Sequence, residues 1–347
     1  MDSRIRRGLR RHGLTLVELL VVITVAVVLL AVAIPLAKQP LEQQKLREAS
    51  RQLNAMIAGA QARAADLNRP VGILLEPSPS ALNASEGVTR VYYAEVPPLY
   101  GGDVTGAQAS LISNNAGANF AVFDYRSYAG VLAIIRAGDL IRFNYRGRWF
   151  PIISDPQIVV ANQSVRVRIS VVNANEINFG SAPFQVRRRP KKSVRPPIDL
   201  PGKTTIDMAA SGLGNAGFDL GRRFDPVTNS MVAVPVLIMF QPSGAVDSVY
   251  RGPDWVRATG PIHFLVGRPH QVFPTAPFSM TEDDTANLRD ENTMWVSIGP
   301  TTGKITTTEN LPTDGFVADP NLPFNAAAQR LMTARTFAMS SQAKGGR

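Results

Sequence analysis

Residues with the types and spacing that catalysis requires are few in this 347-residue chain. There is no cysteine, which excludes thiol nucleophiles, disulfides and cysteine-based zinc sites. His263 and His270 lack an H-E-x-x-H pattern and an obvious carboxylate partner, so we expect neither to bind a metal. Glu282, Asp283 and Asp284 form a short acidic segment without EF-hand spacing, which favours a solvated turn over a calcium site. The sequence therefore predicts no catalytic residue, no cofactor site and no metal site.

Two glycine-rich segments resemble nucleotide-binding loops only superficially. Residues 212–217 match G-x-G-x-x-G, but a dinucleotide site needs a helix directly afterwards, and residues 218–226 show no helical face. Residues 299–304 are one residue short of a P-loop, and Ile305 occupies the position of its Ser or Thr. A G-x-S-x-G nucleophile elbow is absent as well. We therefore expect loops at both segments and a protein that is not an enzyme.

Cationic side chains are the remaining candidates for chemistry, since the net charge is +10. One group alternates with Phe143, Tyr145 and Trp149, and a second group forms a dense run with prolines. Cations beside aromatic rings can bind single-stranded nucleic acid through phosphate contacts and stacking. We favour a strand and a solvated loop, and nucleic-acid binding stays open as an alternative. The candidate contacts are Arg142, Arg146, Arg148, Arg187, Arg188, Arg189, Lys191 and Lys192, with Arg195 nearby.

One carboxylate, Glu18, interrupts an otherwise apolar stretch over residues 14–37. As a helix this stretch would be about 36 Å long at roughly 1.5 Å per residue, which is enough to cross a bilayer. Five arginines precede it, and cationic flanks tend to stay in the cytoplasm. The pattern predicts a single-pass inner-membrane protein with a cytoplasmic N-terminus and an external body. A charge inside such a span is costly and therefore indicates a function.

The residues around Glu18 resemble the N-terminal motif of type IV prepilins and pseudopilins. Gly13 stands behind a short basic leader and before the sequence LTLVELLVVI. The resemblance implies that a prepilin peptidase cleaves after Gly13 and methylates Leu14, and that Glu18 serves filament assembly. Leu14 departs from the usual Phe. Two alternatives are a plain signal anchor and a secretory signal peptide cut at the A-x-A site of residues 31–33.

An amphipathic helix is expected to continue the apolar stretch over residues 38–67. Apolar residues recur there at helical spacing, with charged and amide side chains between them. The prolines at 35 and 40 should bend or loosen the helix, and Asn68-Arg69-Pro70 should end it. The expected buried face consists of Leu41, Leu46, Ala49, Leu53, Ile57, Ala60, Ala64 and Leu67.

The remainder of the chain reads as short strands separated by turns. A βαβ alternation and internal repeats are absent, so we predict an α+β fold with the long helix packed on an antiparallel sheet. The expected divisions are a leader at 1–13, the two helix parts, a β-rich domain at 68–310 with an insertion near 181–200, and a tail at 311–347 with a possible helix. We favour a helix at 324–339 that packs on the body, and a frayed tail or a helix that binds a partner stays open. Strands are expected at 71–75, 90–95, 120–124, 131–136, 140–145, 157–160, 165–172, 235–240, 262–266 and 294–298.

A weaker resemblance links the body to H-type minor pseudopilins of type II secretion systems. The join between Ala62-Arg63-Ala64-Ala65 and Arg69-Pro70-Val71-Gly72-Ile73 looks like the end of their long helix and their first strand. Residues 240–244, FQPSG, resemble their F-x-P-x-G strand and turn. Residues 296–298 and 302–305 resemble their closing hairpin. Relatives of that type are much shorter, which implies insertions.

Together these patterns predict a structural role. The protein would be a subunit, and by size a minor one, of a type II secretion pseudopilus or a type IV pilus-like filament. The expected partners are a prepilin peptidase, other pilin or pseudopilin subunits and the inner membrane, from which the filament would extract the subunit. Two other function classes stay open. One is a DNA-binding minor pilin in DNA uptake, and the other is an exported enzyme or binding domain that uses the helix only as an anchor.

Overall fold

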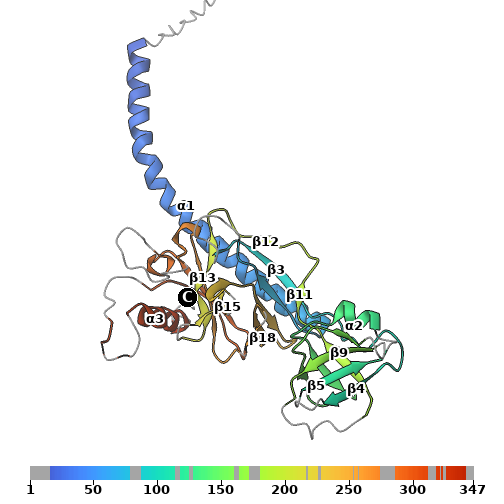
Figure 1. The fold of residues 1–347 in the computed structure, drawn as a ribbon. Coiled ribbons are helices and arrows are strands. Elements are labelled where there is room, and N and C mark those ends of the chain that lie inside the picture. The colour runs from blue at the N-terminus through green and yellow to red at the C-terminus, as the bar shows by residue number, and fades with distance from the viewer. Residues whose placement is uncertain are drawn as a thin grey trace, which may run out of the picture. The chain divides into compact units, whose positions relative to one another are not determined.

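The computed structural model shows an α+β protein, in which one long helix is followed by antiparallel β-sheets (Figure 1), and it confirms the predicted fold class. The chain divides into two compact units, residues 1–45 and 46–347. The structure describes residues 16–78, 87–113, 118–124, 128–159, 164–171, 180–215, 218–225, 228–252, 254–256, 258–273, 286–311, 318–320, 322 and 326–340.

Helix α1 (Leu16–Leu67) is a single element of 52 residues, and it includes the two prolines at positions 35 and 40. It ends at Asn68, whose φ of 47° lies in the left-handed region that Asn tolerates at helix ends. The amides of Asn68 and Arg69 donate to the carbonyls of Ala65 and Ala64, both at 3.3 Å, which satisfies the last turn. The predicted end of the helix is therefore confirmed.

The first sheet of the body has the strand order β11-β3-β1-β17-β18-β19, with β12 also paired to β3, and every pairing is antiparallel. Its central strand β1 directly follows α1, so the helix and the sheet are joined by a very short turn. The strands are β1 (Val71–Leu75), β3 (Arg90–Glu95), β11 (Lys191–Lys192), β12 (Ile198–Asp199), β17 (Val236–Phe240), β18 (Val246–Arg251) and β19 (Asp254–Val256).

The second sheet of the body has the order β14-β13-β20-β21-β22, with β2 paired to β13. A bulge between Asp207 and Gly212 interrupts the pairing of β13 with β20. A separate hairpin, β15 (Arg222–Asp225) and β16 (Ser230–Ala233), precedes β17. The strands of the second sheet are β2 (Gly87–Val88), β13 (Thr205–Leu213), β14 (Phe218–Asp219), β20 (Ile262–Gly267), β21 (Met294–Ile298) and β22 (Ile305–Glu309).

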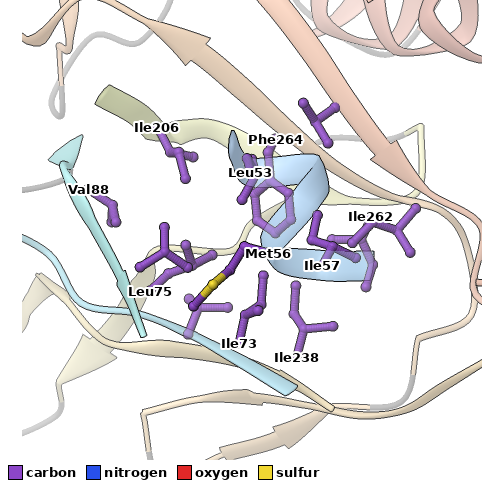
Figure 2. Close-up of a cluster of buried hydrophobic side chains, with 14 of the residues drawn as sticks. Leu53, Met56, Ile57, Ile73, Leu75, Val88, Ile206, Ile238, Ile262 and Phe264 are labelled. Carbon is purple, nitrogen blue, oxygen red and sulfur yellow. The ribbon is translucent and has the colours of Figure 1, made fainter. Parts of the chain in front are cut away.

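The main core lies where α1 contacts both of these sheets. Figure 2 shows Leu53, Met56 and Ile57 of the helix between Ile73 and Ile238 of the first sheet and Ile262 and Phe264 of the second. The predicted apolar face is buried from Leu46 to Ala64, whereas Leu41 is 56% exposed. Burying such a stripe between two apolar sheet faces is what holds α1 in the body, because each large aliphatic side chain contributes about 1.5–3 kcal/mol.

A third sheet and a second core occupy the chain between β3 and β11, and we call residues 100–187 the inserted region. Its order is β7-β6-β10-β4-β5-β9-β8. Its core includes Phe123 and Phe184, whose rings meet edge to face at 4.8 Å. The candidate insertion at 181–200 covers only the end of this region. The elements are β4 (Gln108–Ser113), β5 (Asn119–Phe123), α2 (Tyr128–Ile134), β6 (Leu140–Phe143), β7 (Phe150–Pro151), β8 (Gln157–Val159), β9 (Ser164–Ile169) and β10 (Ala182–Arg187).

Helix α3 (Ala326–Ser340) packs on the body, as the sequence predicts for residues 324–339. Leu331, Ala334 and Ala338 are buried against Trp295 and Leu265 of the second sheet. Phe337 of the same helix is 36% exposed.

Most predicted strands occur close to their expected positions, but one prediction was wrong. Residues 131–136 were expected to form a strand, and residues 128–134 instead form α2. The amide of Gly130 in its first turn donates to the Asp103 carboxylate at 2.8 Å. The guanidinium of Arg136 donates to the carbonyls of Leu132 and Ala133 at its end. These contacts stabilise both ends of a helix that the short apolar run alone leaves ambiguous.

Candidate functional site

Glu18 lies in the first turn of α1, where the partial positive charge of the helix terminus favours a carboxylate. From Leu16 to Leu30 the large apolar side chains around it are exposed, with fractions between 51% for Val21 and 81% for Leu16. Thr24 donates its hydroxyl to the carbonyls of Leu20 and Val21, so its polar group is satisfied within the helix. The described start of α1 is thus an apolar surface with one carboxylate near its end.

Two neighbouring observations limit what this segment shows. Gly13 and Leu14, the predicted cleavage and methylation positions, lie outside the described residues. Among the residues that the structure describes, no helix meets the length and hydropathy criteria for crossing a membrane.

Gln61 fixes the body part of α1 to two turns that are distant in sequence. Its amide nitrogen Nε2 donates to the carbonyl of Gly244 at 3.0 Å and to the carbonyl of Gly303 at 2.7 Å. Gly244 ends the F-x-P-x-G segment, and Gly303 lies in the turn between β21 and β22. The structure therefore brings together three segments that the sequence resemblance named separately.

The two glycines allow these turns to touch. Gly303 has a φ of 67°, and a Cβ atom there would lie 1.9 Å from the carbonyl oxygen of Gly244. A side chain at position 303 is excluded by both the backbone conformation and the contact. The amide of Val246 also donates to the carbonyl of Pro300 at 2.9 Å. The two turns thus pack against each other beside Gln61 of α1.

The last turns of α1 are held to the first sheet by a carboxylate. Glu95, the last residue of β3, pairs with Arg63 at 3.1 Å and with Arg69 at 3.2 Å. At the other edge of the helix, Asn54 donates to the hydroxyl of Thr307 at 2.6 Å. Because all these groups are partly buried, the polar contacts fix the rotation of α1 about its axis relative to the two sheets.

The basic run that the sequence placed in a solvated loop is instead part of the folded body. Arg187, at the end of β10, pairs with Asp247 of β18 at 2.9 Å. Arg189 stacks its guanidinium 5.5 Å from the ring centroid of Tyr250, and Lys192 lies 3.3 Å from that of Tyr92.

Further contacts anchor the same run. Lys192 pairs with Glu76 at 2.8 Å, and Arg188 donates to the carbonyl of Pro98 at 3.4 Å. Lys191 is exposed in the edge strand β11. The expectation of a solvated loop was wrong for most of this run, because its cations contact the body at Asp247, Pro98, Tyr250 and Tyr92, and within the described residues only Lys191 is left exposed without such a contact.

The other basic group lies in the inserted region around β6. Arg142 donates twice to Gln185 on the neighbouring strand β10 and lies 4.5 Å from the ring centroid of Trp149. Arg146 and Arg148 follow in an exposed turn rather than in a strand. The eight predicted nucleic-acid contacts thus fall into two groups, one at this turn and one along the outer face of the first sheet.

His263 is a buried residue of β20 and has no arrangement suited to metal binding. Its Nδ1 lies 2.8 Å from the hydroxyl of Ser297, and burial, helped by the charge of Arg335, lowers the pKa of His263 to about 3. His270 is exposed in the short helix η4 (Pro269–Gln271). Within the described parts of the chain, no three potential metal ligands cluster.

The glycine-rich segment 212–217 lies at the end of a strand. Its described part ends β13, and the two-residue strand β14 follows it where a dinucleotide fold would have a helix. Residues 282–284, the acidic segment, lie outside the described residues.

A buried polar network supports the second sheet, and sequence reasoning missed it. Asp207 accepts hydrogen bonds from Asn287 and from the amides of Ala209 and Ala210, and burial raises the pKa of Asp207 to about 6. Arg335 of α3 is fully buried and donates to the carbonyls of Ala210 and Gly214. An arginine among the apolar residues of a terminal helix was the available signal, since such a residue needs buried acceptors.

Comparison with known proteins bears on the N-terminal segment alone. Residues 8–34 match the prokaryotic N-terminal methylation motif. They form a type IV prepilin signal. Proteins with this signal are structural rather than enzymatic, are anchored through the N-terminal helix, and assemble with other pilin-type subunits after peptidase processing. No curated protein and no solved structure matches the chain.

Proposed function

We propose that the chain is a structural subunit of a pilus-like filament, a type II secretion pseudopilus or a type IV pilus, and not an enzyme. The observation that carries the proposal is the prepilin signal at residues 8–34, placed on a helix whose exposed apolar start holds a single carboxylate. The same helix continues into the body, where it is buried between two sheets. An enzyme that is only anchored to a membrane would not require its apolar helix to continue into the core of its body.

In this proposal a prepilin peptidase cleaves after Gly13 and methylates the new N-terminus at Leu14. Glu18 then lies four residues from the terminal amine, a spacing that would put both groups on one face if the helix continued to the new N-terminus. It would neutralise the amine of a neighbouring subunit as helices stack in the filament. A carboxylate near the centre of a membrane costs about 2.5–3.5 kcal/mol on insertion scales, so pairing with an amine offsets a cost that the isolated subunit bears.

The body supports a minor rather than a major subunit. The inserted region adds a third sheet with its own core to the α1-centred body. Gln61, Gly244 and Gly303 join segments that resemble those of H-type minor pseudopilins. The proposed location is the inner membrane, with a cytoplasmic leader and a periplasmic body that is extracted into the filament.

The test is a comparison of Glu18→Val with Glu42→Val, which removes another carboxylate from the same helix. The mature chain should begin at Leu14, with N-methylation, in mass spectra of both variants. Glu18→Val should be cleaved and inserted normally but should be depleted from sheared filaments, whereas Glu42→Val should co-assemble. Normal co-assembly of Glu18→Val would refute the role of Glu18, and a mature chain beginning at Ile34 would refute the prepilin assignment.

A DNA-binding minor pilin is the second candidate, favoured by guanidinium groups that lie over half-buried aromatic rings in the inserted region. Arg142 lies over Trp149, and Arg166 lies 4.9 Å from the ring centroid of Phe120. Removing the charges of Arg142, Arg146 and Arg148 should weaken binding of single-stranded DNA and reduce its salt dependence. Equal DNA affinity of this variant and the native chain would exclude that site.

A further inference from the structure

A surface groove lies where the end of α1, the end of β3 and the edge strand β11 meet. Arg63 and Arg69 of the helix end form one side, and residues 191–195 form the other. Residues 96–98, Val-Pro-Pro, also line it. All of its lining residues belong to described segments of the body. This groove is distinct from the exposed apolar start of α1, and the inference below does not depend on filament assembly.

Positive charge in the groove exceeds what its own carboxylate can neutralise. Glu95 already accepts from Arg63, Arg69 and the hydroxyl of Ser193. Lys191 and Arg195 have no carboxylate within ion-pair distance among the described residues. Both side chains stand on the rim of the groove, so an anionic ligand would meet cations from two sides.

The groove also presents an apolar contact. Val194 is fully exposed, at 104% of its reference area, between Lys191 and Arg195. A fully exposed aliphatic side chain on a proline-bounded loop is stabilised when an apolar group of a partner covers it. The lining prolines offer a rigid apolar surface that costs little entropy to order.

The chemistry of the lining identifies the kind of ligand. None of the residues that line the groove is aromatic, and Tyr92 on the adjacent strand is covered by Lys192. Binding of single-stranded nucleic acid relies on aromatic stacking, which the groove does not offer. We propose that the groove binds an acidic, extended peptide segment of a partner protein, with carboxylates at Lys191, Arg195 and Arg69 and an aliphatic side chain against Val194.

The experiment uses the full chain in detergent micelles and measures fluorescence anisotropy. The probe is a fluorescein-labelled peptide of four Glu-Val-Ser repeats, and the uncharged control is a peptide of four Gln-Val-Ser repeats. The test variant is Lys191→Glu with Arg195→Glu. Its matched control, Lys203→Glu with Lys304→Glu, makes the same change of charge at two exposed lysines that do not line the groove.

The acidic peptide should bind the native chain, and the uncharged peptide should show only background anisotropy. The Lys191/Arg195 variant should weaken this affinity by at least about tenfold, because two attractions become repulsions. The control variant should change it by less than about twofold, and Val194→Ser should weaken it by about threefold.

Three outcomes would overturn the proposal. The first is equal loss in the Lys203/Lys304 control, which would mean non-specific attraction by net charge. The second is that both peptides bind equally well or that neither binds. Lys191 and Arg195 would then serve only as charges that keep the edge strand β11 from pairing with another chain. The third is tighter binding of an oligothymidylate that the Lys191/Arg195 variant abolishes, which would assign the groove to nucleic acid.

Discussion

The core around α1 and the core of the inserted region are both built from antiparallel strands. They differ in whether their residues come from separate segments or from one contiguous segment of the chain. The α1 core joins residues from Leu46 to Ile298, and its strands are interrupted by nearly a hundred residues of other structure. The core of the inserted region is built from Tyr100 to Val186 without interruption. The first therefore needs almost the whole chain, whereas the second uses one contiguous segment, which favours separate unfolding.

The junction between the two regions differs from both cores in being polar. Glu95 and Lys191 are opposite each other in β3 and β11, so the inserted region leaves and rejoins the body at neighbouring positions. Arg187 pairs with Asp247, and Arg189 stacks on Tyr250. Polar and cation–π contacts at partly exposed sites contribute less than apolar burial, so the junction should be the weakest of the three.

The largest expected effect tests whether the cores unfold separately. Ile57→Ala should cost about 3 kcal/mol and Phe184→Ala about 4 kcal/mol, because each leaves a cavity in a closed core. Hydrogen exchange of the full chain should show faster exchange in β1, β17, β20 and β21 for the first variant. For the second, faster exchange should be confined to the inserted region. Loosening of both regions by either variant would contradict two separate units.

Acid should distinguish the body from the inserted region, which contains no histidine. His263 has a folded pKa of about 3, below its ordinary value of about 6.5. Its contribution to stability is therefore complete above about pH 6.5 and is lost as the pH falls toward 3, by about 3 kcal/mol at pH 4. Asp207 acts oppositely, since its raised pKa of about 6 makes the fold more stable as the pH falls from about 6 toward 4.

Thermal unfolding between pH 7 and pH 4 measures the His263 contribution. His263→Phe should remove the acid-induced loss and expose the opposite trend from Asp207. The exposed His270 provides the control, and His270→Phe should keep the native pH dependence. If His263→Phe were as sensitive to acid as the native chain, the buried imidazole would not be the cause.

A smaller effect is expected at the contact between α1 and the two glycine turns. Gln61→Leu keeps an apolar stem but leaves the carbonyls of Gly244 and Gly303 without their donor, which should cost about 2 kcal/mol. Gln44→Leu, at an exposed position of the same helix, should be nearly neutral. Denaturant unfolding of both variants measures the difference. Equal stabilities would show that the turns are held by backbone packing alone.

The smallest effect should come from the edge strand β11 of the first sheet, next to the junction. Lys192→Met removes the cation over Tyr92 and the pair with Glu76, and the expected loss is below about 1 kcal/mol. Lys191→Met removes a neighbouring charge without an aromatic contact and provides the control. A loss above about 2 kcal/mol from Lys192→Met would mean that this edge contact contributes as strongly as the cores.

Local signals in the sequence were sufficient for α1. The apolar stripe and the sequence Asn68-Arg69-Pro70 predict the helix and its end, because both depend on residues within a few positions. The same holds for the prepilin signal with Glu18. Residues 131–136 show the opposite case, since a helix there depends on Asp103, which is 27 residues from Gly130.

Contacts between distant segments explain what the sequence could not predict at the candidate site. Gln61 is one amide among several on a polar helix face, and its role depends on Gly244 and Gly303. The cations at 187–192 read as solvent-exposed because Asp247 and Tyr250 are far along the chain. Most residues of β13 are small or polar, and a bulge begins at Asp207, so no clear alternation marks the strand.

The hydrogen bond from Gln61 to Gly303 also determines how late in synthesis the body can be completed. The two residues are 242 positions apart, and at about 5–20 residues per second a ribosome needs roughly 12 to 50 s to make the intervening chain. During that interval the apolar stripe of α1 has been synthesised but β21 and β22 do not yet exist to cover it. We therefore expect the stripe of the nascent chain to be prone to aggregation until these strands are made, and slow codons late in the message would lengthen that period.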